Sequence, residues 1–295
     1  MSKAVAAKAV GGYIGIFFAF LSAGLFALLN VVLRFASPYL SVWQIMFGRC
    51  LLGALLMILI TRGINSWLLG QDRRTMLLVG ITGGGGIICI MGAILLLPLF
   101  EALCLIYLYP VFAAILSPIL TEDRTELRDW LLITAAFCGT LCILWAGDVN
   151  FSLQVGHLLA LSAAFSYGLS ITLIRRVSGT NSPFTPFFYF CLAGMVIGGL
   201  PVLLQDSSLE ISLRGMGFLL GISLIGASGQ LAAIKALEYL PSTKVGVIGM
   251  SELIFGGILG LWIFSEPVTL LDSLGGTVII ASCLLLNFKP RKIAQ

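Results

Sequence analysis

Charged residues are scarce in this chain of 295 residues: Asp, Glu, Lys and Arg make up 10% of it, against about 25% of an average soluble domain. Apolar residues make up 59%, and the mean hydropathy is +1.08. A soluble fold of this composition would expose large apolar patches to water. No stretch is long and polar enough to form a separate soluble domain. The composition is therefore typical of a polytopic membrane protein with the lipid bilayer as its partner.

Metal-binding and nucleic-acid-binding patterns are also lacking. The chain has a single histidine, His157, so a metal site is not expected, and nothing in the sequence implies a cofactor. No basic patch carries interleaved aromatic residues, which excludes nucleic acid as a partner. The cysteines all fall in apolar stretches without a CxxC pair, where cysteine packs as a small apolar residue. They are Cys50, Cys89, Cys104, Cys138, Cys142, Cys191 and Cys283.

The apolar stretches also lack the residues that membrane enzymes need. An aspartic intramembrane protease needs two acids within the membrane, and the apolar stretches offer essentially Glu252 alone. A Ser/His dyad needs an embedded histidine, whereas His157 lies near the end of its stretch. A lipid phosphotransferase would need acidic or histidine clusters for Mg²⁺. We therefore do not expect an enzyme.

What the sequence has instead is a series of ten apolar stretches, each near the ~20 residues that a helix needs to cross a bilayer. The start of the chain has Lys3 and Lys8 before a full apolar stretch and no convincing cleavage site, which favours a first membrane helix over a removed signal. The predicted fold is an all-α integral membrane protein with ten transmembrane helices. These cover residues 12–35, 40–60, 75–97, 101–120, 128–147, 154–174, 184–204, 215–239, 242–264 and 270–288.

The basic residues orient this series of helices. Thirteen Lys and Arg residues fall on the side of the N-terminus, and Arg34 and Arg214 fall on the other side. Arg49 and Lys235 lie within predicted helices. Because Lys and Arg are enriched in cytoplasmic loops, we expect both termini in the cytoplasm. The predicted location is the cell (inner or cytoplasmic) membrane, which the chain crosses many times as a monomer or a homodimer.

The two halves of the sequence resemble each other. Each half holds five predicted helices, an odd number, so the second copy must be inverted relative to the first. Inverted repeats are a common construction of secondary transporters, which bind the substrate between the repeats near the middle of the membrane. We expect residues 1–150 to form the first five-helix repeat and residues 151–295 the second. The aligned pairs include Gly15 with Gly156, Phe26 with Tyr167, Arg34 with Arg175 and Leu97 with Leu240.

Several short motifs occur in corresponding places of the two halves. The second half carries ALSAAFSYGLSITLIRR at 160–176, and then Ala236, Leu237, Leu240, Pro241, Ser251, Glu252, the run FSE at 264–266, Thr269, Gly275 and Gly276. The first half carries Tyr109, Pro110, Glu122 and Thr125. On these motifs nearly the whole chain resembles the EamA-type branch of the drug/metabolite transporter superfamily, which has ten helices in two five-helix repeats. Glu252 is followed by Leu253, where the family often has proline.

The resemblance implies transport of a small-molecule substrate without ATP hydrolysis. We expect a secondary active transporter that works by alternating access and exports amino acids or related amphipathic solutes. The alternative is an importer or exchanger of a metabolite such as S-adenosylmethionine, because direction follows from gradients and coupling rather than from the fold. A channel or a scaffold would leave the inverted repeat without an explanation.

Glu252 is the main candidate for a functional residue, because it lies about ten residues into its predicted helix and so near the bilayer centre. An ionised acid at that depth costs roughly 3 kcal/mol or more unless it is paired or hydrated. One interpretation is that Glu252 lines a central cavity and binds a substrate cation or a coupling proton. The other is that it is protonated and hydrogen-bonds a neighbouring helix as a structural contact.

Further polar residues inside the predicted helices complete the candidate site. Arg49 would bind a carboxylate or pair with an acid inside the bundle, or else serve packing or topology. The remaining candidates would line a cavity, because polar groups turned towards lipid would be unsatisfied, although packing is an equally good interpretation for each. Among them, Tyr109 is favoured because Pro110 opens the backbone hydrogen-bond ladder beside it. They are Asn30, Tyr109, Tyr167 and Gln230.

Overall fold

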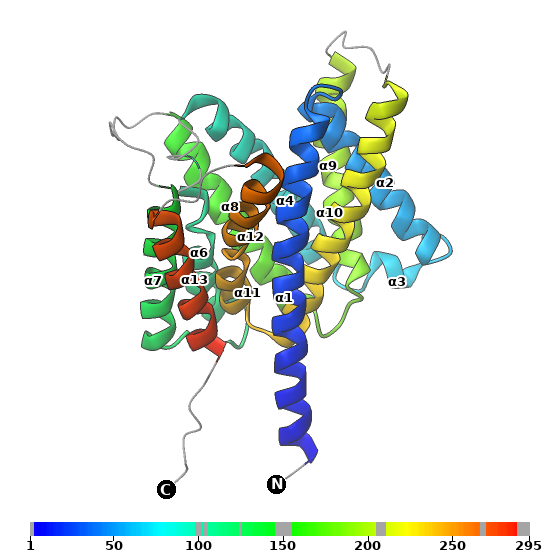
Figure 1. Ribbon diagram of the computed structural model, residues 1–295. Coiled ribbons are helices and arrows are strands. Elements are labelled where there is room, and N and C mark those ends of the chain that lie inside the picture. The colour runs from blue at the N-terminus through cyan, green and yellow to red at the C-terminus, as the bar shows by residue number, and fades with distance from the viewer. Residues whose placement is uncertain are drawn as a thin grey trace, which may run out of the picture.

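The computed structural model describes residues 3–97, 102, 105–123, 125–144, 155–204, 211–265 and 270–287, and Cys104, Glu266 and Thr269 lie outside these ranges. Over the described residues the regular structure is helical and contains no strand. The helices, drawn in Figure 1, are α1 (Lys3–Ala36), α2 (Val42–Ile60), α3 (Ser66–Leu69), α4 (Arg73–Leu96), α6 (Tyr109–Leu120), α7 (Leu127–Leu144), α8 (Val155–Val177), α9 (Phe184–Leu204), α10 (Leu213–Tyr239), α11 (Ser242–Gly249), α12 (Glu252–Phe264) and α13 (Leu270–Asn287).

Seven stretches of the described chain are long and apolar enough to cross a membrane. They are Gly12–Ala36, Val42–Ile60, Arg73–Ala93, Val155–Val177, Phe184–Leu204, Leu213–Tyr239 and Ser242–Phe264. Each coincides with a stretch that the sequence predicts to cross. Shorter apolar helices cover Tyr109–Leu120 and Ser273–Leu285, and α7 lies in the fifth predicted stretch. The chain is thus a multi-pass helical membrane protein, while the count of ten crossings stays a prediction.

Polar residues at the helix starts satisfy backbone N–H groups that have no partner within the helix. Ser41 begins α2 with a capping box: its hydroxyl accepts from the Gln44 N–H (3.2 Å), and the Gln44 side chain accepts from the Ser41 N–H (2.9 Å). Asp72 begins α4 by accepting from the N–H and the hydroxyl of Thr75 at 3.2 and 2.6 Å. These two hydrogen bonds hold the pKa of Asp72 below its ordinary value.

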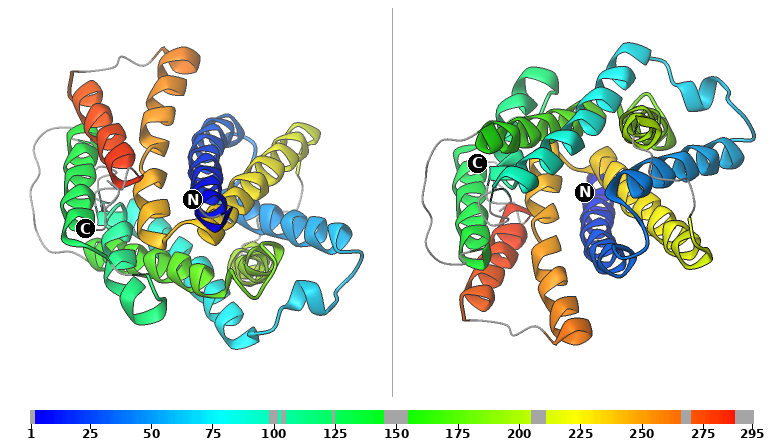
Figure 2. Two further views of the ribbon diagram at one scale, coloured as in Figure 1. Left: turned by 90° about the horizontal axis from the view of Figure 1, so that it is seen from below. Right: turned by 90° about the horizontal axis from the view of Figure 1, so that it is seen from above.

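Helices from the two halves of the sequence pack side by side. In the views along the bundle, α1 lies beside α10 and α7 beside α13, and α4 packs along α8 (Figure 2). Glycines allow the close approach. A Cβ atom on Gly15 of α1 would lie 2.8 Å from Leu240 Cγ, and one on Gly156 of α8 would lie 2.5 Å from Leu97 Cγ. These seams therefore depend on the absence of a side chain at both glycines.

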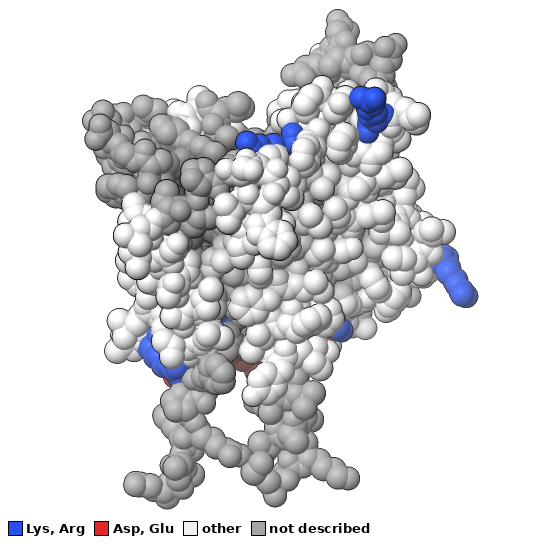
Figure 3. Space-filling model, viewed as in Figure 1, with Lys and Arg blue, Asp and Glu red and all other residues white. Residues whose placement is uncertain are grey.

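The surface suits a lipid environment. On the face shown in Figure 3, the Lys, Arg, Asp and Glu side chains lie towards the ends and one edge of the molecule, and the broad middle is uncharged. Large apolar side chains are exposed on the molecule, such as Val196 (74%) and Trp262 (82%). Exposed apolar groups at this density are stable in contact with lipid rather than water. Helix α1 begins and α13 ends at the same end of the bundle (Figure 1).

Two of the predicted membrane helices are interrupted. The stretch 242–264 divides into α11 and α12 at a turn formed by Met250 and Ser251, so Glu252 is the first residue of α12. In the stretch 101–120, a turn at 107–108 precedes α6, which begins at Tyr109 with Pro110 in its first turn. Proline is tolerated at a helix start because its missing N–H would have no partner there. The interruptions place helix starts inside the bundle.

Candidate functional site

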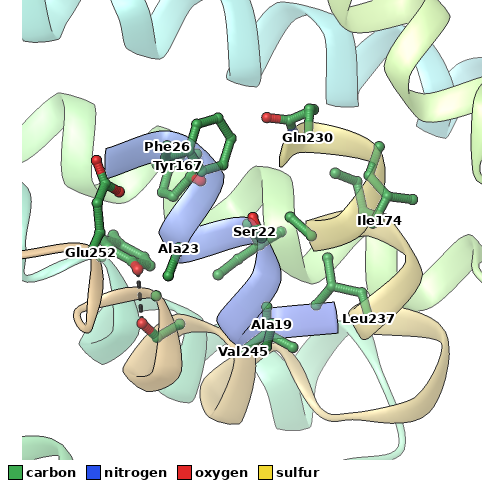
Figure 4. A pocket seen from close by; sticks show the side chains of 16 residues that line it. Ala19, Ser22, Ala23, Phe26, Tyr167, Ile174, Gln230, Leu237, Val245 and Glu252 are labelled. Atoms are coloured by element: carbon green, nitrogen blue, oxygen red, sulfur yellow. Dashed lines mark hydrogen bonds between the residues drawn. The ribbon is translucent and has the colours of Figure 1, made fainter. Parts of the chain in front are cut away.

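A narrow cavity lies between α1, α6, α8, α10 and the interruption between α11 and α12 (Figure 4). Its volume is about 40 Å³, enough for a few water molecules at ~10–15 Å³ each but too small for a metabolite. Most of the lining is small or aliphatic. The polar side chains in its wall are Ser22, Tyr109, Tyr167, Gln230 and Glu252.

The structure brings most of the predicted site residues together. Glu252, Tyr109, Tyr167 and Gln230 all line this cavity. Asn30 does not line it, but its Nδ2 donates a hydrogen bond to Glu252 Oε1 at 2.9 Å. In Figure 4, Glu252 lies at one side of the cavity and Gln230 at the other, with Phe26 and Tyr167 between them. The roles assigned to these residues stay predictions.

Glu252 lies at a helix start inside the bundle. The positive end of the helix dipole favours a carboxylate in the first turn of a helix, and Glu252 is the first residue of α12. The phenols of Tyr109 and Tyr167 line the same cavity as Glu252. The acid therefore has one amide bonded to it and two phenols in the same cavity wall.

Tyr109 connects the two interrupted stretches. Its hydroxyl donates to the Gly246 carbonyl oxygen of α11 at 2.7 Å. Its ring meets the Tyr167 ring edge to face, with 4.8 Å between the ring centroids. Gly168 of α8 makes this approach possible, because a Cβ there would lie 2.7 Å from the Tyr109 carbonyl oxygen. The aromatic wall of the cavity is thus packed from α6 and α8 onto α11.

The opposite wall is the seam between α1 and α10. The Ser22 hydroxyl donates to the Gly229 carbonyl oxygen at 2.9 Å, and both residues lie in buried positions. Next in the chain, Gln230 turns into the cavity across from Phe26 (Figure 4). Ser22 and Phe26 were not among the predicted site residues. Both residues are spaced one helical turn from Ala19 or Ala23 along one face of α1, and Phe26 also aligns with Tyr167 in the repeat.

Arg49 lies outside the cavity lining. It is partly buried in α2, and a Cβ on Gly226 of α10 would lie 3.4 Å from Arg49 Nη2. Gly226 is one helical turn from Gln230 along α10. Within the ranges that the structure describes, Arg49 forms no hydrogen bond and no ion pair. The sequence suggested that Arg49 pairs with an acid inside the bundle. No such pair is formed with an acid that the structure describes.

A second polar contact, which no sequence pattern predicts, lies where α8 and α10 end. Arg175 Nε donates to Asp123 Oδ2 at 2.9 Å. Arg175 Nη1 donates to the carbonyl oxygens of Leu237 (2.8 Å) and Glu238 (3.0 Å) at the end of α10. Its partners lie 52 to 63 residues away in the sequence. A local pattern cannot predict such a contact, and Arg175 was interpreted as a charge that orients the chain and as the repeat equivalent of Arg34.

The chemistry of the site is that of hydrogen bonding and charge rather than of metal binding. Among the described residues, no group of three or more His, Cys, Asp or Glu side chains could hold a metal ion. Glu252 has an amide and phenols around it, which are not the nitrogen and sulfur ligands that transition metals favour. The arrangement can recognise a small polar or charged organic solute.

Comparison with known proteins identifies related transporters. The profile of the EamA-like transporter family matches residues 13–145 and, a second time, residues 154–288. The pseudopaline exporter CntI of Pseudomonas aeruginosa is 27% identical over 273 residues, which cover 92% of this chain and 95% of the exporter. The S-adenosylmethionine uptake transporter of Rickettsia felis is 22% identical over 202 residues, which cover 66% of this chain and 65% of that transporter.

A riboflavin transporter of Vibrio cholerae is also similar, at 26% identity over 187 residues, which cover 63% of this chain and 61% of that protein. Among solved structures, the crystal structure of a protein superimposes with a TM-score of 0.77 at 18% sequence identity, covering 94% of this chain and 96% of the other. At this identity the structural likeness concerns the fold alone.

Proposed function

Because the chain belongs to the EamA-like transporter family, we propose that it is a secondary active transporter that moves a small metabolite by alternating access. The observation that carries the proposal is the cavity at the interruption between α11 and α12, with Glu252 at its edge. Binding sites of secondary transporters are typically formed by discontinuous helices near the middle of the membrane. We assign the cavity as the substrate site, and Glu252 as the group that binds a substrate cation or a coupling proton.

The proposed architecture is two inverted five-helix repeats, residues 1–150 and 151–295, making ten transmembrane helices. The family profile matches the chain twice, once in each half. Packing supports the same division, because contacts recur with the halves exchanged. Gly15 of the first half meets Leu240 of the second, and Gly156 of the second meets Leu97 of the first. These four residues are the pairs that the sequence aligns.

A second reciprocal contact lies between α2 and α9. A Cβ on Gly53 would lie 2.9 Å from Cys191 Sγ, and a Cβ on Gly194 would meet Cys50 Sγ. The register that aligns Gly15 with Gly156 also aligns Cys50 with Cys191 and Gly53 with Gly194. Two equivalent residues that meet across an interface are expected where a two-fold axis passes, so this contact supports the inverted repeat independently of the first.

Alternating access requires closed and open forms of the cavity. A volume of about 40 Å³ supports a closed form, because no metabolite fits. We propose that Arg175 helps to close the cytoplasmic side, since it ties α8 to the end of α10 and to Asp123. Breaking this contact would let α8 and α10 separate and open the cavity towards the cytoplasm. This assignment rests on the predicted orientation in the inner membrane, with both termini in the cytoplasm.

The proposed cargo is an amino acid or a related amphipathic solute, moved outwards. The cavity offers an acid, an amide and phenols beside aliphatic surface, which suits a solute with polar and apolar parts. Uptake or exchange of a metabolite such as S-adenosylmethionine is the second candidate. Both directions occur among the similar proteins, as the names of the pseudopaline exporter and the S-adenosylmethionine uptake transporter state.

Transport in inverted membrane vesicles tests the proposal. Vesicles with wild-type protein should accumulate a labelled L-amino acid when a pH gradient is imposed. Glu252→Gln should abolish this accumulation. The matched control is Glu238→Gln, which changes an acid that pairs with Lys235 away from the cavity and should leave accumulation intact. The proposal fails if Glu252→Gln changes neither the affinity for the amino acid nor the dependence on the gradient.

Metabolite levels separate the two candidate directions. Cells that express the chain should hold less of the exported amino acid inside and more outside than cells without it. Higher internal S-adenosylmethionine in expressing cells supplied with that metabolite would favour the second candidate instead. An unchanged distribution of both classes would contradict the proposed cargo.

A further inference from the structure

The charged and amide side chains at or near the cavity lie on one of the two sets of helices that the proposed two-fold axis relates. Two alignments, Gly15 with Gly156 (141 residues apart) and Leu97 with Leu240 (143 residues apart), give each site residue an equivalent in the other half. Asn30, Arg49 and Gln230 correspond to Ile171, Phe190 and Ile87. Glu252 is the first residue of α12, where Tyr109 is the first residue of α6. The side that holds α1, α2, α10 and α12 thus carries charges and amides where the other carries apolar or phenolic groups.

Arg49 and Phe190 occupy matching places in the packing. Gly226 of α10 faces Arg49 and Leu29. A Cβ on Gly226 would lie 3.4 Å from Arg49 Nη2 and 3.5 Å from Leu29 Cδ2. In the other half, Gly83 of α4 faces Phe190 and Ser170. A Cβ on Gly83 would lie 2.9 Å from Phe190 Cδ2 and 3.3 Å from Ser170 Oγ. Leu29 and Ser170 are equivalent in the alignment of Gly15 with Gly156, and Gly83 and Gly226 in the alignment of Leu97 with Leu240. A phenyl ring therefore meets the packing needs of this position, and a guanidinium is not required for them.

The charge of Arg49 needs another explanation. A guanidinium inside a membrane helix is energetically costly unless it is paired or hydrated. Arg49 lies in the middle part of α2 and has no hydrogen bond or ion pair to any residue that the structure describes. An unpaired charge in this position is a place where a ligand can supply the counter-charge.

Two groups of opposite charge lie near Tyr167. The Tyr167 hydroxyl interacts electrostatically with both Glu252 and Arg49. Glu252 and Gln230 reach the cavity directly, and Arg49 lies one helical turn beyond Gln230, opposite Gly226. An acid at the cavity and a guanidinium beyond Gln230 match a solute that carries a positive and a negative group at different positions.

Resting on the proposed transport function, we propose that Arg49 is a specificity-determining residue that binds the carboxylate of a zwitterionic substrate. Glu252 then faces the ammonium group of the same molecule, and the tyrosine wall contacts its body. Arginine suits this role because its planar donor fork binds both oxygens of a carboxylate. Contact requires the cavity to extend past Gln230 towards Gly226, which opening of the closed form would provide.

Amino acids and their amides distinguish the charge contact from general binding. The probes are each of the twenty L-amino acids and the corresponding L-amino acid amides, measured by counterflow in proteoliposomes. An amide keeps the ammonium group and the side chain but loses the negative charge. For a transported amino acid, Arg49→Gln should raise the half-saturation concentration about tenfold or more, the size of one lost charge-assisted hydrogen bond. The same variant should leave the half-saturation concentration of the amide unchanged.

Three variants separate the charge contact from folding. Arg49→Phe installs the residue that the other half carries at this place, so it should fold and should lose the preference for the acid over the amide. Arg49→Lys keeps the charge without the donor fork and should retain part of that preference. Lys235→Gln, which changes a basic residue of α10 outside the cavity lining, should retain all of it.

The outcomes are distinct. An equal effect of Arg49→Gln on acid and amide, or no effect on either, would overturn the assignment of Arg49 while leaving transport itself in place. Wild-type protein that moves neither the amino acids nor the amides would overturn the proposed function instead. Loss of acid selectivity in folded Arg49→Phe, with transport of the amide retained, supports the assignment.

Discussion

Helices α11 and α12 continue one another along a single apolar stretch, yet they are packed very differently. Most of α11 is buried, and Tyr109 holds it by the hydrogen bond to Gly246. In α12 only Gly260 is buried, although the helix has 13 residues. Its contacts are with α1 and, to a lesser extent, α13, whereas α11 contacts α1, α6, α8, α10 and α13. The turn at Met250 and Ser251 divides a tightly packed half from a loosely packed one.

This difference indicates which part of the site can move. Segments with few buried contacts open at lower free energy than packed ones. Moving α12 disturbs few contacts, while moving α11 would break the core around Tyr109. Glu252 lies at the junction of the two, where a small rotation of α12 would change what its carboxylate faces. We therefore expect α12 to move and α11 to stay in place as the cavity opens on the side of α12.

The largest difference in stability between the two helices should appear when an apolar side chain is truncated in α11 and in α12. Ile248 of α11 is fully buried, and Ile258 of α12 is 48% exposed. Ile248→Ala should lower the free energy of unfolding by about 2–5 kcal/mol, because it leaves a cavity in the core. Ile258→Ala should cost much less, since lipid or detergent fills the space. Unfolding of both variants in the same detergent measures the two losses, and equal losses would contradict the comparison.

A methyl group added to α11 and to α12 should give the next largest difference in stability. A Cβ on Gly249, the last residue of α11, would lie 2.5 Å from the Tyr109 hydroxyl oxygen, so Gly249→Ala must displace that hydroxyl from Gly246. We expect a loss of about 1–3 kcal/mol in stability. A Cβ on Gly257 of α12 has nothing within 4 Å. Gly257→Ala should be neutral or stabilising by about 0.5–1 kcal/mol.

Melting temperatures of the two glycine variants, together with their counterflow rates, check this expectation. Transport should fall in Gly249→Ala because Tyr109 lines the cavity, and it should persist in Gly257→Ala. If alanine at both positions lowered the melting temperature alike, α12 would be more tightly packed than the structure indicates.

A smaller effect is expected at the Arg175 contact, because it acts on an equilibrium between forms rather than on the fold. Arg175→Gln removes an ion pair and two hydrogen bonds to carbonyl oxygens. Losing about 1.4 kcal/mol from the closed form would raise the fraction open to the cytoplasm about tenfold. Arg176→Gln is the matched control, since Arg176 is the next residue and is exposed.

Thiol labelling measures that fraction. A cysteine at Gln230 in the cavity should react with a membrane-impermeant reagent in inverted vesicles about tenfold faster when Arg175→Gln is present. The native cysteines give the background rate. Equal labelling with Arg175→Gln and with Arg176→Gln would show that the Arg175 contact does not close the cytoplasmic side.

The sequence predicted much of the helix pattern but not the interruptions. Seven of the predicted stretches match helices long enough to cross a membrane, because length and hydropathy are local properties. The stretch 242–264 was predicted as one helix, since Glu252 is followed by leucine rather than proline and nothing at Met250 or Ser251 disfavours a helix. The start of α6 had a local signal in Pro110. Where the interruption depends on tertiary packing alone, the sequence does not reveal it.

The site was predicted in part for the same reason. Polar residues inside apolar stretches are conspicuous, and Tyr109, Tyr167, Gln230 and Glu252 do line one cavity. The hydrogen bond from Asn30 to Glu252 joins residues 222 positions apart, so no local pattern predicts it. Ser22 and Phe26 were missed because a serine and a phenylalanine on an apolar helix face are ordinary packing residues. Glu252 does accept a hydrogen bond from Asn30 of α1, while both interpretations of its role stay predictions.

A reversible tether on each half tests the central claim, that α12 moves while α11 stays fixed. Phe35 of α1 and Phe264 of α12 lie with ring centroids 5.3 Å apart, and Ser117 of α6 and Ser242 of α11 have hydroxyl oxygens 3.1 Å apart. Each pair is replaced by cysteines and joined by a short thiol-reactive crosslinker that a reductant cleaves, with treated wild-type protein as the background. We expect the tether on α12 to stop counterflow until it is cleaved, whereas the tether on α11 should leave counterflow intact. Full counterflow with α12 tethered to α1 would contradict it.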